Sequence, residues 1–201
     1  MQEKYCSKCG SALKAKAEGG RQRAWCAACG HIVFGHFSLG VGGLLTNAGR
    51  VLLVQRAQEP GRGRWTLPGG YAEEDEPPDE AVVREVLEET GLRVTTVGLL
   101  AIRHALGAEN QNLYYVFELA LAGPVEDLRE AGDGHEIAHA GLYRLAALDA
   151  VGELGLISRW VIEQYAAGMS SLRRVPDAIL PQTLPSHRWT AVFAGVSRSD
   201  R

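Results

Sequence analysis

The positions of the cysteines constrain this chain more than any other feature of its sequence. All four, Cys6, Cys9, Cys26 and Cys29, lie within the first 30 of 201 residues and form two Cys-x-x-Cys pairs. Sixteen residues separate Cys9 from Cys26, a spacing that is typical of a structural zinc site. Four thiolates fill the tetrahedral shell of Zn²⁺ and leave no position for a substrate water, so we expect a structural ion.

The segment around these cysteines has few apolar residues, so bound zinc would supply most of its folding free energy. Gly10 and Gly30 follow the second cysteine of each pair, and glycine permits the tight turn that brings backbone amides close to the sulfurs. We therefore predict a small zinc ribbon over residues 1–34. Four unrelated reduced thiols and a redox Cys-x-x-Cys motif are weaker alternatives, because the strand–motif–helix setting that activates a redox pair is not indicated.

The overall composition is that of a globular protein, with 46% hydrophobic and 22% charged residues. A net charge of -3 argues against a dedicated nucleic-acid binder, although a local basic patch stays open. No stretch approaches the roughly 20 apolar residues that cross a bilayer, and the first residues contain no hydrophobic signal core. We therefore expect a cytoplasmic protein without a membrane partner.

Short runs rich in Val and Leu, separated by turn-forming residues, indicate that strands dominate after the ribbon. The expected strands cover residues 36–46, 50–56, 93–103, 111–122 and 137–145. One helix is expected to begin at Pro77 and Pro78 and to end at Gly91, and a second to cover 153–167. This pattern predicts an α/β domain over residues 36–169. The remaining residues, 170–201, show little periodicity, and we assign them no structure.

The first of these helices carries a cluster of acidic residues. Glu85, Glu88 and Glu89 fall on one helix face, at positions i, i+3 and i+4. Val83 and Leu87 lie on roughly the opposite side, where we expect them to be buried. Converging carboxylates repel each other unless a cation lies among them, and an oxygen-only set favours Mg²⁺ or Mn²⁺ over zinc. A solvated acidic helix face is the alternative, and helix geometry alone does not exclude it.

Residues 70–92 resemble the Nudix box, G-x5-E-x7-R-E-U-x-E-E-x-G-U, in which U is a bulky aliphatic residue. Every specified position agrees: Gly70, Glu76, Arg84, Glu85, Val86, Glu88, Glu89, Gly91 and Leu92. The resemblance extends over about residues 38–165, through RWTLPGG (64–70) and E-x5-LY (136–143). It implies the Nudix α/β/α sandwich with a mixed sheet, here preceded by the zinc ribbon.

The resemblance also implies the metal site. Glu85, Glu88 and Glu89, together with the backbone carbonyl of Gly70, would bind catalytic Mg²⁺ or Mn²⁺. Arg84 would orient the three carboxylates.

Two further glutamates are assigned by the same resemblance. Glu76 would brace the loop against the helix. The general base would be either a glutamate of the box or one on a later loop, here Glu136, for which an ordinary loop residue is an equal alternative. The implied activity is metal-dependent hydrolysis of the diphosphate in a nucleoside diphosphate linked to another moiety X, which releases a nucleoside monophosphate.

The identity of X depends on weaker features. A ribbon ahead of the box resembles the arrangement of NADH pyrophosphatases, but the SQPWPFP-like motif of that subfamily is missing. We favour ADP-ribose, FAD or an NADH-like dinucleotide. Arg56 and Arg64 are candidates for phosphate contacts, with solvated arginines as the alternative. Tyr115, with its neighbour Tyr114, is a candidate for stacking on a base, with half-buried strand tyrosines as the alternative.

Two other functions stay open. A non-catalytic sensor of nucleotide metabolites would share the fold, but such proteins tend to lose carboxylates that this chain keeps. An RNA-decapping hydrolase would use the ribbon, whose mild basic excess suits nucleic acid. The resemblance also leaves a homodimer open, since the fold is often dimeric.

Overall fold

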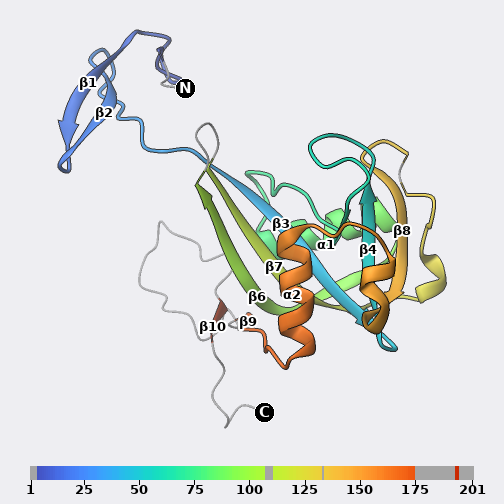
Figure 1. The fold of residues 1–201 in the computed structure, drawn as a ribbon. Coiled ribbons are helices and arrows are strands. Elements are labelled where there is room, and N and C mark those ends of the chain that lie inside the picture. Colours follow the sequence, from blue (N-terminus) through green and yellow to red (C-terminus); the bar gives the residue numbers. More distant parts are fainter. Residues whose placement is uncertain (1–3, 107–110, 133, 175–192, 195–201) are drawn as a thin grey trace. The chain divides into compact units, whose positions relative to one another are not determined.

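The computed structural model describes residues 4–106, 111–132, 134–174 and 193–194. The chain divides into two compact units, which are described separately. One comprises Met1–Ser38 with Ala105–Asn112, and the other Leu39–His104 with Leu113–Arg201. Figure 1 shows the ribbon hairpin at one end of the chain and the sheet with its two helices in the larger unit.

The ribbon is built on an antiparallel hairpin of β1 (Leu13–Glu18) and β2 (Arg21–Cys26). Gly19 and Gly20 connect the strands with φ of 59° and 74°, the double left-handed conformation of a tight hairpin turn. Among the described residues before Leu39, only Cys6 and Cys26 are buried. The ribbon therefore has no apolar core of its own.

The larger unit contains a six-stranded mixed sheet with the order β5-β4-β3-β7-β6, in which β8 also pairs with β4. The expected strands are confirmed, with bounds shifted by up to three residues. The observed strands are β3 (Phe37–Asn47), β4 (Arg50–Arg56), the short β5 (Trp65–Thr66), β6 (Val94–Leu106), β7 (Gln111–Leu121) and β8 (Ile137–Arg144).

The helices form apolar layers on both faces of this sheet. The helical elements are α1 (Pro78–Thr90), α2 (Leu156–Ala166) and two 3₁₀ helices, η1 (Val125–Asp127) and η2 (Leu145–Ala150). Leu45 of β3 packs with α1, whereas its neighbour Leu44 packs with α2. Since adjacent strand residues point to opposite faces, α1 and α2 cover opposite faces. The predicted α/β fold class is confirmed.

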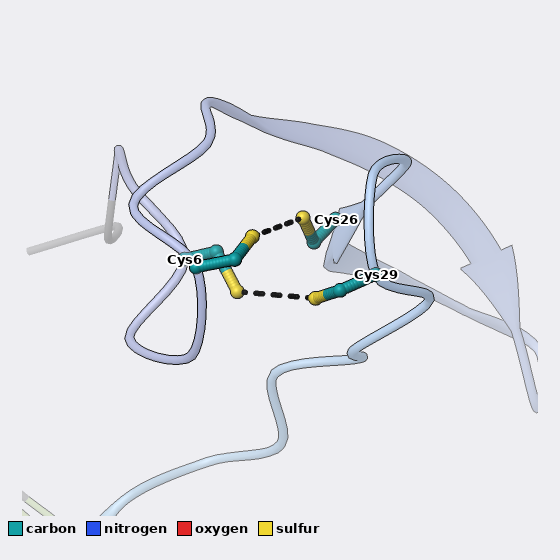
Figure 2. Close-up of side chains that lie close together, drawn as sticks. Cys6, Cys26 and Cys29 are labelled. Atoms are coloured by element: carbon teal, nitrogen blue, oxygen red, sulfur yellow. Dashed lines mark hydrogen bonds between the residues drawn. The ribbon is translucent and has the colours of Figure 1, made fainter.

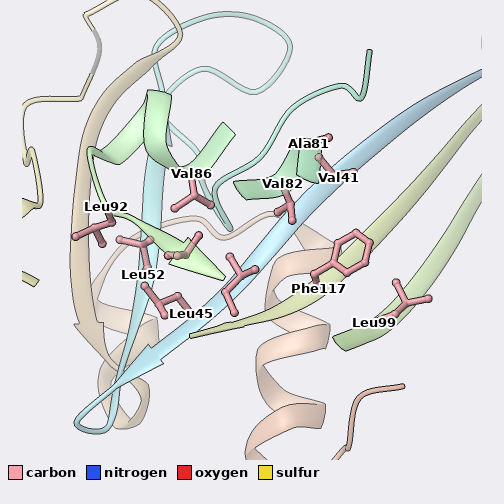
Figure 3. Close-up of a cluster of buried hydrophobic side chains, with 11 residues drawn as sticks. Val41, Leu45, Leu52, Ala81, Val82, Val86, Leu92, Leu99 and Phe117 are labelled. Carbon is pink, nitrogen blue, oxygen red and sulfur yellow. The ribbon is translucent and has the colours of Figure 1, made fainter. Parts of the chain in front are cut away.

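The buried face of α1 differs from the expectation. Val82 and Val86 are fully buried in the layer beneath α1 (Figure 3), whereas Leu87 is 45% exposed and Val83 is only partly buried. At about 100° per residue, Val82 and Val86 lie some 60° and 100° from Glu85, not opposite to it. The expectation was wrong for Leu87 and is met in part by Val83, which packs against this layer while partly buried. The acidic residues therefore border the core, and Glu89 is itself buried, with 5% exposure.

The segment after residue 169 contains more structure than we expected. Leu172 bridges to Leu99 of β6, and the Ser171 hydroxyl donates a hydrogen bond of 2.6 Å to Glu118. β9 (Arg173–Arg174) pairs with β10 (Phe193–Ala194). Short pairings of this kind leave no periodic signal in the sequence. The rest of the segment lies outside the described residues.

Candidate active site

The four cysteines gather into one cluster in the ribbon. All four sulfurs lie within 4.8 Å of one another. The Sγ atoms of Cys6 and Cys29 are 3.7 Å apart, and those of Cys9 and Cys26 are 3.5 Å apart (Figure 2). Zinc–sulfur bonds of about 2.3 Å in a tetrahedron place the sulfurs about 3.8 Å apart. The cluster therefore has the dimensions of a zinc shell.

Local backbone geometry holds these cysteines. Gly10 and Gly30 have φ of 71° and 76°, and their N–H groups donate to the carbonyls of Cys6 and Cys26. Hydrogen bonding from Ser11 lowers the pKa of the Cys9 thiol to about 6. A backbone hydrogen bond at His31 lowers the pKa of the Cys29 thiol, but the neighbouring cysteines and burial raise it to about 12. The four thiols therefore do not titrate alike, and a bound metal ion would have to displace the proton of Cys29.

The ends of α1 are fixed by both local and distant groups. Pro77 caps the start, and Gly91 ends the helix with φ of 76° and an N–H bond to the carbonyl of Leu87, as the sequence predicted. The guanidinium of Arg129 donates to the carbonyls of Leu87 and Glu88 at 2.9 and 2.7 Å. This cation satisfies the helix end that carries the carboxylates, and it lies too far along the chain for the sequence to reveal it.

Arg84 lies among the acidic side chains of this region. Its Nε and Nη2 atoms donate to Glu76 at 2.6 to 3.2 Å. Its Nη1 donates to both Glu85 at 3.0 Å and Glu88 at 3.1 Å, so one nitrogen joins the two carboxylates. Its Nη2 also donates to the carbonyl of Tyr71. One side chain thus ties the loop before α1 to two of the three clustered carboxylates.

The glycine pair before the helix approaches the other side of the cluster. The N–H of Gly69 donates to Glu89 Oε2 at 2.8 Å. A Cβ at Gly70 would lie 2.5 Å from Glu85 Oε1, so only glycine leaves room for this carboxylate. The carbonyl of Gly70 accepts the N–H of Val41 at 2.8 Å, which pins the loop to β3.

The carboxylates respond differently to these surroundings. Burial, with smaller contributions from the charges of Glu88 and Glu136, raises the pKa of Glu85 even though Arg84 opposes the shift. Hydrogen bonding from Arg84 instead lowers the pKa of Glu76. Glu76 is therefore stable as an anion, whereas Glu85 is a partly desolvated charge that a cation would stabilise.

Glu136 reaches this region from a different part of the chain. It is exposed and directly precedes β8, and its carbonyl accepts the N–H of Ala57 at 2.7 Å. Gln58 donates to the carbonyl of His135 at 2.9 Å. The residues after β4 therefore hold the loop of Glu136, whose charge acts on Glu85. Sequence reasoning missed Gln58 because an exposed loop glutamine gives no signal.

The candidate substrate arginines lie close together around Gly61, whose added Cβ would be 3.8 Å from both Arg56 Cδ and Arg64 Nη1. Arg64 forms an ion pair with Glu153. Arg56 Nε donates to the carbonyl of Pro60 at 2.9 Å. Arg64 is thus already engaged by a carboxylate, which distinguishes the two candidates.

The two tyrosines of β7 point to opposite faces of the sheet. Tyr115 stacks on Phe117, with centroids 6.5 Å apart, and packs against the α1 layer. The Tyr114 ring lies on β3, where a Cβ at Gly42 would meet its hydroxyl at 2.1 Å. Burial and the charge of Glu89 raise the pKa of Tyr114, while Arg103 and Arg56 lower it. The charges of Glu89 and Glu85 therefore act on Tyr114, while Tyr115 packs against the layer of the helix that carries them.

Known protein families agree with this geometry. The family model described as NUDIX domain matches residues 36–164, and the zinc-ribbon model described as Nudix N-terminal matches residues 4–34. The first model covers well over half of the chain.

The chain belongs to the Nudix family.

Individual relatives agree with this assignment. An ADP-ribose pyrophosphatase of Methanocaldococcus jannaschii is 40% identical over 67 residues, or 33% of this chain and 40% of the relative. An NAD-capped RNA hydrolase, NudC, of Stutzerimonas stutzeri is 29% identical over 182 residues, or 90% of this chain and 61% of the relative. The chain thus spans less than two thirds of the length of either curated relative.

The fold agrees as well. A Nudix hydrolase structure from Nitrosomonas europaea superposes with a TM-score of 0.69 at 26% identity, covering 84% of this chain and 96% of that one. The predicted Nudix sandwich is confirmed. None of the helices in the described part of the chain is both long and apolar enough to cross a bilayer.

Proposed function

We propose that this Nudix protein is a metal-dependent pyrophosphohydrolase that cleaves the diphosphate of a nucleoside diphosphate linked to X. One observation carries the proposal: Glu85 and Glu89 lie at the edge of the core on α1, faced by the Gly69–Gly70 loop, and Arg84 joins Glu85 to the exposed Glu88. Salt bridges alone do not account for this arrangement, because Glu85 remains desolvated despite its arginine partner.

The donor set fits Mg²⁺ or Mn²⁺. Glu85, Glu88, Glu89 and the carbonyl of Gly70 offer only oxygen atoms, which hard cations prefer. A cation bound there would polarise the diphosphate and lower the pKa of an attacking water. A cation would also stabilise the charge that burial disfavours at Glu85.

The protein's own residues supply position and proton transfer. Arg84 and Glu76 hold the loop against α1 and set the direction of the Glu85 and Glu88 carboxylates. A glutamate accepts the proton of the attacking water. Glu136 is a candidate because its charge reaches Glu85, and the box glutamates are the others.

The substrate contacts follow from the surroundings of the cluster. Arg56 is the better phosphate contact, since its charge reaches Tyr114 beside Glu89 and Arg64 is paired with Glu153. Tyr114 is a candidate for contact with the substrate beside Tyr115, because the charges of Glu89 and Glu85 act on it. Both tyrosines also pack against apolar layers. ADP-ribose is the first substrate to test, given the named activity of the Methanocaldococcus relative.

A panel assay tests the proposal. The protein would be incubated with Mg²⁺ or Mn²⁺ and ADP-ribose, NADH, FAD, diadenosine polyphosphates or oxidised dNTPs, with product release followed by chromatography. We expect release of a nucleoside monophosphate from at least one dinucleotide-type substrate. Calorimetry would detect a sensor as tight ADP-ribose binding without turnover, and that result would overturn the hydrolase proposal.

A further inference from the structure

The charge of the chain is divided unevenly between the ribbon and the rest. Residues 1–34 contain six Lys and Arg against two Glu, a surplus of four positive charges. The remaining residues contain fifteen basic and twenty-two acidic residues, a deficit of seven. The net charge of the whole chain is small because the basic ribbon offsets part of the acidic charge of the remaining residues.

The hairpin register places most of this charge on one face. Directly paired residues of an antiparallel hairpin share a face, and β1 and β2 pair Lys14 with Trp25, Lys16 with Arg23 and Glu18 with Arg21. The opposite face carries Leu13, Ala15, Ala17, Gln22, Ala24 and the buried Cys26. The first face is called the cationic–aromatic face here, and it comprises Lys14, Lys16, Glu18, Arg21, Arg23 and Trp25.

Aromatic rings are interleaved with these charges. The Arg23 guanidinium carbon lies 4.7 Å from the centroid of the Phe34 ring, and Lys16 Nζ lies 5.7 Å from that of Trp25. Phe34 is nevertheless 60% exposed, so Arg23 leaves much of the side chain open. Arg23 Nε is buried without a hydrogen-bond partner among the described residues, as expected of a guanidinium that stacks on a ring.

Little acidic charge compensates this face. Lys16 contacts Glu18 at 3.1 Å, but both side chains are more than 40% exposed, so solvent screens the pair. Lys14 and Arg21 are exposed. The face thus combines cations for phosphates with rings for bases, which is the chemistry that binds single-stranded nucleic acid. A duplex hides its base faces, and an acidic peptide has no bases to stack.

From this geometry we propose that the cationic–aromatic face of the ribbon binds single-stranded RNA. Lys14, Lys16 and Arg21 contact phosphates, and unpaired bases stack on Phe34 and Trp25. The proposal goes beyond the hydrolysis proposed above and does not depend on it. The ribbon then gives this Nudix protein a second binding site, with an RNA chain as its ligand.

Fluorescence anisotropy tests the proposal on the full, zinc-loaded chain. The probe is a 3′-labelled oligouridylate of about 12 nucleotides, within the range of single-strand site sizes. It carries a 5′-hydroxyl and therefore no diphosphate bond, so failure to bind and failure to hydrolyse are separate results. We expect salt-dependent binding, because phosphate contacts release counterions.

A pair of matched variants locates the site. Lys16→Ala with Arg21→Ala removes one exposed cation from each strand of the face, both of them proposed phosphate contacts, and we expect affinity to fall about tenfold at low salt with a shallower salt slope. Arg50→Ala with Arg144→Ala removes an equivalent exposed cross-strand pair from β4 and β8 and serves as the control. We expect less than about twofold loss there, since neither side chain lies on the proposed face. Equal losses in both double variants would overturn the proposal.

A third variant separates stacking from charge. Phe34→Leu keeps an apolar side chain but removes the ring, and we expect affinity to fall at least about fivefold with zinc content unchanged. Unchanged affinity in this variant would contradict base stacking. Equal binding of an RNA duplex, equal displacement by polyglutamate, or tighter binding of oligothymidylate would each overturn the assignment to single-stranded RNA.

Discussion

The cluster of four cysteines in the ribbon and the group of three glutamates on α1 are supported by different kinds of structure. The four cysteine sulfurs gather within 4.8 Å in a ribbon whose only buried described residues are two of those cysteines. Glu85 and Glu89 border a layer of fully buried apolar side chains, and Arg84 joins Glu85 to the exposed Glu88. Within the described ranges, only the cysteines bring three or more such ligand atoms this close.

This difference indicates a different source of folding free energy in each unit: metal binding in the ribbon and apolar burial in the larger unit. The ribbon lacks the buried apolar area that would offset its conformational entropy, so we expect its fold to depend on a bound ion. The larger unit has two apolar layers, and these can hold a buried Glu89 and a Glu85 whose charge burial disfavours. A cation would be structural in the first unit and functional in the second.

Removing zinc should give the largest effect, because structural zinc contributes about 10–16 kcal/mol to folding in comparable ribbons. We expect Cys26→Ser, or strong chelation, to abolish hydrogen-exchange protection of the β1 and β2 amides. Amides of α1 should keep theirs, because residues of the larger unit build the α1 layer. Ribbon amides that stay protected without zinc would contradict a zinc-dependent ribbon fold. Loss of hydrolysis on mild chelation, while both units stay folded, would contradict a purely structural role for zinc.

Glu89→Gln should give the next largest effect. Loss of this buried carboxylate should lower kcat about 10²–10⁴-fold in the assay of the best substrate. The thermal unfolding midpoint should change little, since the amide can still accept the Gly69 N–H. Glu80→Gln, an exposed position on the same helix, is the control and should keep wild-type kcat. Near-normal turnover in Glu89→Gln would refute the assignment of the metal site.

Gly70→Ala should have a smaller effect on kcat, of up to about 10²-fold, because misplacement of a catalytic group by about 1 Å has this cost. The new Cβ would meet the Glu85 carboxylate at 2.5 Å and displace it, while the apolar layers stay intact. Circular dichroism should show an unchanged fold. Gly35→Ala, where the only neighbour within 4 Å is Phe37, is the matched substitution. Equal activity in the two variants would contradict a role for the Gly70–Glu85 contact.

Truncations on α1 measure how much the buried core contributes to the free energy of unfolding of the larger unit. Val86→Ala should lower the free energy of unfolding by about 2 kcal/mol, since Val86 is fully buried. Leu87→Ala should change it by less than about 0.5 kcal/mol, because this side chain is 45% exposed. Chemical denaturation at a fixed metal concentration gives both values. If Leu87→Ala were more destabilising than Val86→Ala, the buried face of α1 would be the one that the sequence indicated.

The smallest effect concerns pH. Burial raises the folded pKa of Glu85 above its ordinary value of 4.5, so its contribution to stability is fully present below about pH 4.5 and is lost as pH rises through the folded pKa. In metal-free protein, Glu85→Gln should therefore be more stable than wild type at neutral pH, and this advantage should vanish at acidic pH. Denaturation curves across pH would show it, and saturating Mg²⁺ should reverse it at neutral pH. A stability difference independent of pH would contradict the desolvation of Glu85.

Much of the architecture was predictable because its signals are local. Pro77 and Gly91 limit α1 through their own backbone preferences, and the turn between β3 and β4 follows from Gly49, which accepts a positive φ. The cysteine spacing was also sufficient, since a tetrahedral ion admits few arrangements of two Cys-x-x-Cys turns. These features need no knowledge of distant parts of the chain.

The rest depended on contacts between residues far apart in sequence. Arg129 caps the helix that carries the glutamates, Gln58 holds the loop of Glu136, and Glu153 engages Arg64. The sequence around each of these polar residues does not indicate which distant residue it contacts. Periodicity also misplaced the buried face of α1, because a pattern of apolar residues does not say which side meets the sheet.

The sequence by itself determined the elements, the thiol cluster and the family, because glycine and proline conformations, ligand spacing and the box pattern act over short distances. Only the tertiary structure decided that Glu85 and Glu89 are desolvated, that their charges act on Tyr114, and that β1 and β2 place cations and rings on one face. Burial and charge at a residue arise from every element packed around it, and the chain brings those elements together only when it folds.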